Sequence, residues 1–162
     1  MVSVADPTDG ATIGKMSAKH GVSILFGTST FFRLYTRNKK LHPLMFQNVR
    51  IVIAGAEKLK PDVKDAFRLK FGLEIHEGYG TTETAPVAAV NVPNILEKDS
   101  LKELTFTKEG TVGLPLPGTI IKIVDPDTLN ELKTGEDGLI LIGGGQVMKG
   151  YLDDPEKTAE GI

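Results

Sequence analysis

The 162-residue sequence contains no cysteine. This absence excludes disulfides, zinc–thiolate sites, iron–sulfur clusters and cysteine nucleophiles. No apolar run approaches the roughly 20 residues that a membrane-spanning helix needs, and the first residues lack the regions of a signal peptide. The formal net charge is only -2, so the basic surplus typical of a duplex nucleic-acid binder is missing. We therefore expect a globular chain with no nucleic-acid partner and no membrane span of its own.

Several common catalytic patterns are also missing. The sequence has no Gly-x-Gly-x-x-Gly fingerprint, no Gly-x-Ser-x-Gly elbow and no His-x-x-x-x-Asp acyltransferase signature. The glycine-rich stretch 143–150 lacks the Gly-Lys-Ser/Thr ending of a phosphate-binding loop. His20, His42 and His76 show no metal-ligand spacing, which favours structural or solvent-facing roles for all three.

The first 90 residues alternate short apolar runs with segments of helical spacing. The segments expected to be helical are 11–20, a helix capped by Ser29 or Thr30, and 61–71. The segments expected to be strands are 2–4 (the end of one), 22–26, 50–54 and 73–76. This alternation is typical of an α/β fold in which helices cover a mainly parallel sheet.

The pattern changes after residue 90. Residues 91–110 predict a surface loop, and no helix is indicated from Thr111 onward. The alternation over 119–124 and the second apolar run at 138–142 predict a small antiparallel β region. We therefore expect an α/β part over residues 1–105 and a small β subdomain over 106–162.

Unusual residues follow two of the predicted parallel strands, where ligands bind in open sheets. One segment is Gly55-Ala56-Glu57, and the other is Gly78-Tyr79-Gly80-Thr81-Thr82-Glu83. An aromatic ring can stack on a base, hydroxyls can donate to phosphate oxygens, and a carboxylate can hold Mg²⁺. The simpler interpretation is that both segments are glycine turns and that Glu83 is a helix-capping or surface carboxylate.

The segment Tyr79-Gly80-Thr81-Thr82-Glu83 resembles the Tyr-Gly-x-Thr-Glu motif of adenylate-forming enzymes. Four more segments resemble motifs of that family in the same order: 23–34, 53–59, 110–118 and 138–158. Details such as Gly27-Thr28-Ser29-Thr30-Phe31 and Ala85-Pro86-Val87 are similar to acyl-[acyl-carrier-protein] synthetases. The similarity extends in particular to the synthetase part of bifunctional 2-acylglycerophosphoethanolamine acyltransferases.

This resemblance implies a role for each matching residue. Thr82 and Glu83 would be catalytic, with Thr82 on the α-phosphate and Glu83 on Mg²⁺. Tyr79 would stack on adenine within an AMP/ATP site, and Gly80 would also border an acyl pocket. The full AMP/ATP set is Gly55, Ala56, Glu57, Gly78, Tyr79, Gly80, Thr81 and Thr82. The full acyl-pocket set is Thr28, Gly80, Ala85 and Pro86.

The same resemblance implies an activity for a longer parent protein. With ATP as substrate and Mg²⁺ as cofactor, the parent would convert a fatty acid to an acyl-adenylate and then to a thioester. The thiol would belong to acyl carrier protein or CoA. The subfamily also implies a lysophospholipid partner through an acyltransferase domain outside these residues, and a location on the cytoplasmic face of the inner membrane.

Parts of the family's catalytic apparatus do not occur among these residues. They are the lysine-bearing phosphate loop, the ribose-binding aspartate and the C-terminal lid with its catalytic lysine. We therefore expect a segment of a larger AMP-binding domain that is inactive alone. The alternative is a non-catalytic folded binding or interaction module with at most weak affinity for nucleotide.

Overall fold

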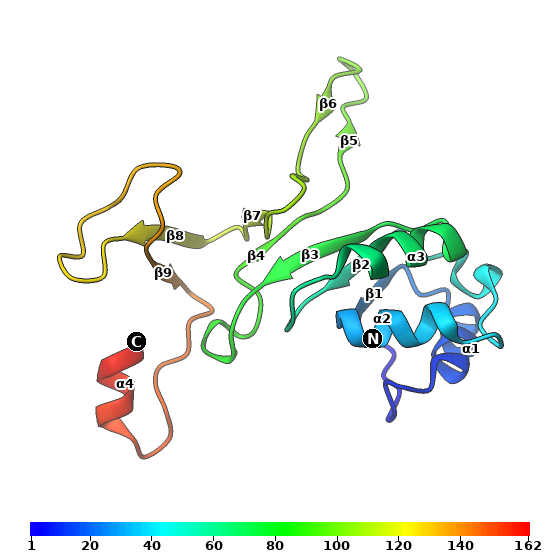
Figure 1. Ribbon diagram of the computed structural model, residues 1–162, viewed down its shortest axis with the longest axis horizontal. Coiled ribbons are helices and arrows are strands. Elements are labelled where there is room, and N and C mark those ends of the chain that lie inside the picture. Colours follow the sequence, from blue (N-terminus) through cyan, green and yellow to red (C-terminus); the bar gives the residue numbers. More distant parts are fainter. The chain divides into compact units, whose positions relative to one another are not determined.

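The computed structural model describes all 162 residues, which form two compact units. Unit 1 comprises Met1–Gly78 and Asn91–Gly113, and unit 2 comprises Tyr79–Val90 and Leu114–Ile162. The elements of unit 1 are α1 (Gly10–His20), β1 (Ile24–Gly27), α2 (Ser29–Arg37), the 3₁₀ helix η1 (Pro43–Phe46), β2 (Ile51–Ala54), α3 (Pro61–Phe71), β3 (Ile75–Tyr79, its last residue in unit 2), β5 (Ile95–Leu96) and β6 (Glu103–Leu104) (Figure 1). The elements of unit 2 are the 3₁₀ helix η2 (Thr82–Thr84), β4 (Ala89–Val90), β7 (Leu114–Pro115), β8 (Thr119–Val124), β9 (Leu139–Gly144) and α4 (Pro155–Gly161).

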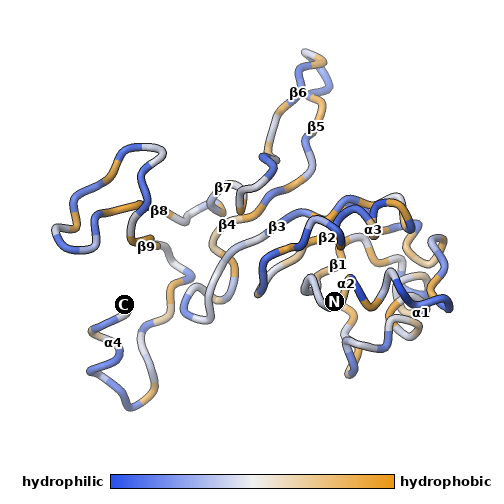
Figure 2. The backbone as a smooth tube through the Cα atoms, viewed as in Figure 1, coloured by the Kyte–Doolittle hydropathy of each residue, from blue (hydrophilic) through white to orange (hydrophobic).

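Three parallel strands form the sheet of unit 1, with β2 between β1 and β3. Because side chains alternate across a sheet, Leu25, Val52 and Ile75 share one face and are buried there with side chains from α1, α2 and α3. On the other face of β1, Ile24 and Phe26 are exposed by 42% and 65%. Figure 2 shows hydrophobic stretches in this part of the chain. The predicted parallel α/β arrangement is confirmed, with the helices of this chain burying one face.

Aromatic rings fill the space between the sheet and its helices. Phe32 and Phe67 are completely buried, with ring centroids 5.1 Å apart in an edge-to-face arrangement. Phe46 and Phe71 repeat this arrangement, also at 5.1 Å. Such pairs contribute about 0.5–1.5 kcal/mol beyond the burial of their area. The four rings therefore fix α2 and α3 on the sheet, and with them the loops that follow β1 and β2.

The ends of the helices follow from particular residues. The Asp9 carboxylate accepts the Thr12 N–H at 3.1 Å and begins α1. Gly21 ends α1 with a φ of 59°, in the left-handed region that glycine enters without strain. Pro61 begins α3, and Gly72 ends it in the same way as Gly21 ends α1. These local signals explain why both helices were predictable from the sequence.

Unit 2 is built from short antiparallel pairs and irregular segments. The hairpin of β8 and β9 pairs six residues of each strand, and β4 pairs with β7. The predicted antiparallel region is therefore confirmed. No helix of either unit is both long and apolar enough to cross a bilayer.

The structure corrects four details of the sequence prediction. The stretch 155–161 is helical, because Asp154 caps it through the Lys157 N–H at 2.9 Å and Pro155 occupies its first turn. Residues 91–110 include the short hairpin of β5 and β6. Residues 2–4 form no strand. The cap of α2 is Thr28, whose hydroxyl accepts the Phe31 N–H at 3.3 Å, and neither Ser29 nor Thr30.

Lys70 should contribute more to stability than an ordinary surface lysine. Its Nζ donates to the carbonyls of Tyr35, Thr36 and Asn38 at 3.1, 2.9 and 2.7 Å, at the C-terminal end of α2. We expect Lys70→Met to keep the packing of the aliphatic stem but to leave these carbonyls without the ammonium. The free energy of unfolding in urea should fall by roughly 1.5–3 kcal/mol, the range for hydrogen bonds to a charged group.

Lys64→Met is the matched control on the same helix. Lys64 makes ion pairs with Glu109 at 3.4 Å and Glu74 at 4.0 Å, and both carboxylates are exposed. Such pairs contribute about 0–1 kcal/mol. Equal losses of stability in the two variants would show that Lys70 has no special role at the end of α2.

Candidate functional site

The first predicted ligand segment follows β2 in unit 1. The register pairs Ala54 with Glu77, so Gly55 lies beside Gly78, and a Cβ at Gly55 would lie 4.0 Å from the Gly78 carbonyl oxygen. The next residue, Ala56, has a φ of 66°. A left-handed alanine costs about 1–3 kcal/mol and occurs mainly where the surrounding structure imposes it, often at functional sites. The segment is therefore a backbone turn held at a sheet edge next to Gly78.

Glu57 connects this turn to the beginning of α2. Its carboxylate accepts the Thr30 N–H at 2.6 Å and the Thr30 hydroxyl at 3.2 Å. The bond from the Thr30 N–H, followed by those from the Thr28 and Thr30 hydroxyls, lowers the pKa of Glu57. The side chain of Glu57 is thus engaged in contacts within the protein.

The second segment forms a tight loop in unit 2. A Cβ at Gly80 would lie 1.8 Å from the Pro86 carbonyl oxygen, so only glycine allows this approach. The buried Thr84 hydroxyl accepts the Thr81 N–H at 2.9 Å, and the Tyr79 carbonyl accepts the Ala88 N–H at 2.8 Å. These contacts close the loop on itself and fix its shape without a ligand.

Two of the three threonines in the closed loop remain accessible. Thr81 and Thr82 are exposed, and so are Ala85 and Pro86 at its other end. Ala85 also has a positive φ, of 53°, so the Tyr79–Pro86 loop, like the turn after β2, contains one left-handed alanine. Ala56 and Ala85 are both exposed, and the surrounding structure holds each in a left-handed backbone conformation. Such strained residues often occur at functional sites.

Glu83 occupies the short helix η2 and is held by residues far along the chain. The Tyr151 hydroxyl donates to Glu83 Oε1, and the Met148 N–H donates to the Glu83 carbonyl at 2.8 Å. The bond from Tyr151 is the main cause that holds the pKa of Glu83 at about 2, well below its usual 4.5. The carboxylate is therefore ionised at every physiological pH. It caps no helix end, since Thr81 is the N-cap of η2.

The donor set fits a cation that is shared with a ligand. No group of three or more histidine, aspartate or glutamate side chains could enclose a metal ion. Mg²⁺ in nucleotide sites is usually held by one or two carboxylates together with phosphate oxygens and water. The single ionised carboxylate of Glu83 beside the exposed hydroxyls of Thr81 and Thr82 suits that arrangement.

The predicted site residues fall into two sets. Unit 1 brings together Thr28, Gly55, Ala56, Glu57 and Gly78; unit 2 brings together Tyr79, Gly80, Thr81, Thr82, Glu83, Ala85 and Pro86. Sequence reasoning gave no role to Thr84 or Tyr151. Thr84 could have been recognised as the third residue after Thr81, the spacing of a reciprocal cap. Tyr151 is 68 residues from Glu83, and only the resemblance of residues 138–158 to a family motif drew attention to it.

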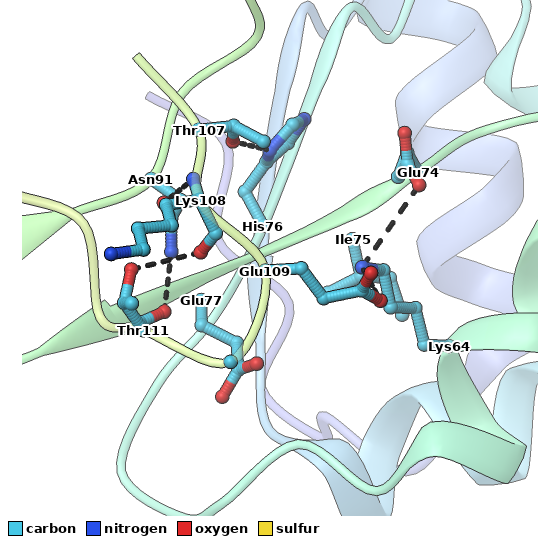
Figure 3. A pocket seen from close by; sticks show the side chains of 11 residues that line it. Lys64, Glu74, Ile75, His76, Glu77, Asn91, Thr107, Lys108, Glu109 and Thr111 are labelled. Atoms are coloured by element: carbon cyan, nitrogen blue, oxygen red, sulfur yellow. Dashed lines mark hydrogen bonds and ion pairs between the residues drawn. The ribbon is translucent and has the colours of Figure 1, made fainter. Parts of the chain in front are cut away.

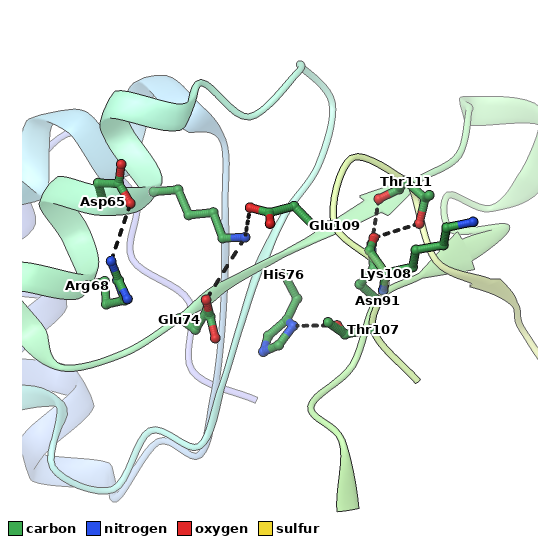
Figure 4. A network of polar contacts seen from close by, with 10 residues as sticks. Asp65, Arg68, Glu74, His76, Asn91, Thr107, Lys108, Glu109 and Thr111 are labelled. Atoms are coloured by element: carbon green, nitrogen blue, oxygen red, sulfur yellow. Dashed lines mark hydrogen bonds and ion pairs between the residues drawn. The ribbon is translucent and has the colours of Figure 1, made fainter. Parts of the chain in front are cut away.

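A separate pocket lies in unit 1 and contains none of the predicted site residues. It is lined by Lys64, Glu74, Ile75, His76, Glu77, Asn91, Thr107, Lys108, Glu109, Gly110 and Thr111 (Figure 3). The Asn91 amide donates to the Thr111 carbonyl at 2.5 Å and accepts the Lys108 N–H at 3.0 Å. Figure 4 shows these contacts of Asn91 with the segment after β6, and the separate contact of His76 in β3 with Thr107 of the same segment. The pocket is thus crossed by internal hydrogen bonds that hold the fold.

His76 in this pocket is only 9% exposed, and its Nδ1 lies 3.3 Å from Thr107 Oγ1. Burial lowers its pKa, an effect that nearby Glu74 opposes and Lys64 reinforces. The unfolded chain therefore takes up the proton first as the pH falls. The stability linked to neutral His76 should therefore be fully present above about pH 6.5, and it should be lost progressively as the pH falls below that value.

We expect His76→Asn to reduce this loss of stability. Asparagine can keep the contact with Thr107 but does not titrate. Urea unfolding at pH 7.5 and 5.5 should show a smaller decrease for His76→Asn than for the wild-type chain. An identical decrease in wild type and His76→Asn would contradict the prediction.

Comparison with known proteins places this geometry in context. Residues 1–152 match the profile of the AMP-binding enzyme family. The chain is 32% identical over 157 residues to a long-chain-fatty-acid–CoA ligase of Salmonella typhimurium, covering 97% of this chain and 26% of that protein. It is 37% identical over 145 residues to 4-coumarate–CoA ligase 2 of Solanum tuberosum, covering 89% and 26%.

A solved structure is also similar to this chain. ATP-bound MatB from Rhodopseudomonas palustris superposes with a TM-score of 0.72 at 30% identity, over 94% of this chain and 28% of that one. The chain therefore spans about a quarter of the length of the curated relatives that it matches.

Proposed function

Because this chain belongs to the AMP-binding enzyme family, we propose that it forms part of an ATP-dependent acyl-adenylate-forming ligase. The observation that carries the proposal is the preorganised Tyr79–Pro86 loop with the ionised Glu83 at its centre. The parent enzyme joins a fatty acid to AMP and then transfers the acyl group to a thiol. In the first step the carboxylate oxygen attacks the α-phosphorus of ATP, and the bond to the pyrophosphate oxygen breaks.

The residues of this chain serve that step by binding and orienting the nucleotide. The turn at Gly55, Ala56 and Glu57 offers backbone groups around adenine, with Gly78 beside it. Tyr79 supplies the aromatic plane for the base. Thr81 and Thr82 donate from exposed hydroxyls to phosphate oxygens, with Thr82 on the α-phosphate.

Glu83 holds the cation of the substrate complex. Bound Mg²⁺ would neutralise phosphate charge and so lower the repulsion that the attacking carboxylate meets. Glu83 contributes a full negative charge at a fixed position, because its pKa of about 2 keeps it ionised. Thr28, Gly80, Ala85 and Pro86 border the acyl chain in this proposal.

The proposal also covers the acid substrate and the thiol that accepts the acyl group. A fatty acid is supported by the similarity to a long-chain-fatty-acid–CoA ligase. The acceptor thiol is that of CoA, as in the relatives' names, or of acyl carrier protein, as the motif resemblance implies. Onward transfer to a lysophospholipid would require an acyltransferase domain outside these residues.

The test uses the full-length protein that contains these residues. ATP–pyrophosphate exchange is measured with acetate, 4-coumarate and fatty acids of increasing length, and thioester formation with CoA and with holo acyl carrier protein. We expect exchange that depends on a fatty acid and a thioester with one of the two thiols. Exchange with none of the acids would contradict the proposal.

Binding without turnover is the alternative that this assay separates. A non-catalytic module would bind ATP in equilibrium dialysis and yet show neither exchange nor thioester. The presence of an exposed, preformed loop is compatible with binding alone, whereas the ionised, anchored carboxylate favours the metal-dependent reaction.

A further inference from the structure

Contacts with Thr158 and Lys157 hold Tyr151, whose hydroxyl binds the Glu83 carboxylate. Its N–H donates to the Thr158 hydroxyl at 2.9 Å, and that hydroxyl donates to the Asp154 carbonyl at 2.8 Å. Lys157 Nζ lies 4.7 Å from the centroid of the Tyr151 ring. The ring is thus fixed from its backbone side and from one face, and its hydroxyl is directed at Glu83.

The backbone at Gly150 packs closely against Thr158, the residue that holds Tyr151. A Cβ at Gly150 would lie 2.7 Å from Thr158 Cγ2, and the φ of Gly150 is 150°. A side chain at residue 150 would therefore displace Thr158 and, with it, Tyr151. On the other side, the Met148 N–H binds the Glu83 carbonyl at 2.8 Å. Residues 148–158 hold both the backbone and the side chain of Glu83.

We propose that Tyr151 is a positioning residue, whose hydroxyl binds one carboxylate oxygen of Glu83 and orients the other for a divalent cation. Carboxylates that bind metals are themselves usually hydrogen-bonded, and those outer partners orient the ligand. Because the backbone of Tyr151 is itself held by Thr158, its hydroxyl donates to the Glu83 carboxylate from a fixed position. The inference rests on the proposed function, because it takes Glu83 as the metal ligand.

The experiment compares Tyr151→Phe with Glu83→Gln in the full-length protein. Phenylalanine keeps the ring and its contact with Lys157 but removes the hydroxyl. We expect the Mg²⁺ concentration for half-maximal adenylation to rise about 10- to 100-fold, as for other outer partners of metal ligands. The rate at saturating Mg²⁺ should change much less, since the ligand itself is retained.

A second readout does not depend on activity. Mn²⁺ replaces Mg²⁺, and its affinity is measured by electron paramagnetic resonance in the presence of a non-hydrolysable ATP analogue. Tyr151→Phe should weaken Mn²⁺ binding by a similar factor while the melting temperature remains close to that of wild type. A merely structural role would lower the melting temperature and leave Mn²⁺ affinity intact, and that result would overturn the inference.

Tyr35→Phe is the matched control. It removes a tyrosine hydroxyl that donates to the Pro7 carbonyl at 2.7 Å in unit 1. It should reduce stability without changing Mn²⁺ affinity. If it weakens Mn²⁺ binding as much as Tyr151→Phe does, the effect of Tyr151 is not specific, and the inference fails.

The double variant separates this inference from the proposed function. If Tyr151 acts through Glu83, Glu83→Gln with Tyr151→Phe should bind Mn²⁺ no more weakly than Glu83→Gln alone. A clear further loss would overturn the positioning role. Weak binding in Glu83→Gln with normal binding in Tyr151→Phe refutes only the inference. Normal binding in both single variants refutes the metal site of the proposed function as well.

Discussion

The 162-residue chain alone should release no pyrophosphate in response to a fatty acid. Its sequence contains no lysine-bearing phosphate loop, and positioning of reactants contributes on the order of 10⁵- to 10⁸-fold to the rate of a reaction between two bound groups. The loop at Tyr79–Pro86 supplies only part of that positioning. The measurement is a coupled pyrophosphate assay on the purified chain with ATP, Mg²⁺ and a fatty acid, beside the full-length protein.

Two controls make this result interpretable. Urea unfolding must show that the chain is folded, because an unfolded polypeptide would be inactive for an uninformative reason. ATP binding is measured in parallel, and weak binding without turnover is the expected outcome. Pyrophosphate release by the chain at a rate near that of the full-length protein would contradict the prediction.

The elements of unit 1 were predictable because their signals are local. Capping by Asp9, Pro61 in a first turn and the glycines at 21 and 72 mark the helix ends within a few residues. The apolar runs at β1 and β2 are typical of parallel strands. The short helix α4 was missed because its seven residues carry no apolar periodicity, although Asp154 and Pro155 are an N-terminal signal.

The candidate site could be predicted only in part. The motif identified the residues of the Tyr79–Glu83 loop, but not the contacts that hold them. Thr84 fixes the loop through a hydroxyl that the motif leaves unspecified, and Tyr151 reaches Glu83 across 68 residues of sequence. Contacts over such separations depend on the packing of the whole unit, which hydrophobic periodicity does not report.

Glu57 is another residue whose contacts the motif did not indicate. Its place in a family-like segment led to its inclusion in the nucleotide site. The structure engages its carboxylate with Thr30 at the beginning of α2. In the proposed nucleotide site, any role of this turn would therefore fall to its backbone, since the Glu57 side chain holds the turn against α2.

Replacing Glu83 by Gln in the full-length protein should slow acyl-adenylate formation on the order of 10²- to 10³-fold, the typical cost of removing one group that stabilises developing charge. Glutamine keeps the size of the side chain, and its amide oxygen can still accept the Tyr151 hydroxyl. It removes the negative charge that a hard cation prefers. Single-turnover adenylation over a Mg²⁺ titration is the measurement.

The second half-reaction provides an internal control for Glu83→Gln. Thioester formation from pre-made acyl-adenylate involves no departure of pyrophosphate, so it should be much less affected. Glu136→Gln is the matched variant, since Glu136 is an exposed carboxylate whose only hydrogen bond accepts the Lys133 N–H at 2.8 Å. It should leave both half-reactions unchanged.

The pattern of losses decides what Glu83 does. Because its pKa of about 2 keeps it charged across the working pH range, no accessible pH mimics the substitution, and the variant is the direct test of the charge. A selective loss of adenylation with an unchanged melting temperature identifies a metal ligand. Equal losses in both half-reactions, together with a sharp fall in melting temperature, would instead mean that Glu83 serves the fold by holding residues 148–151 against its loop.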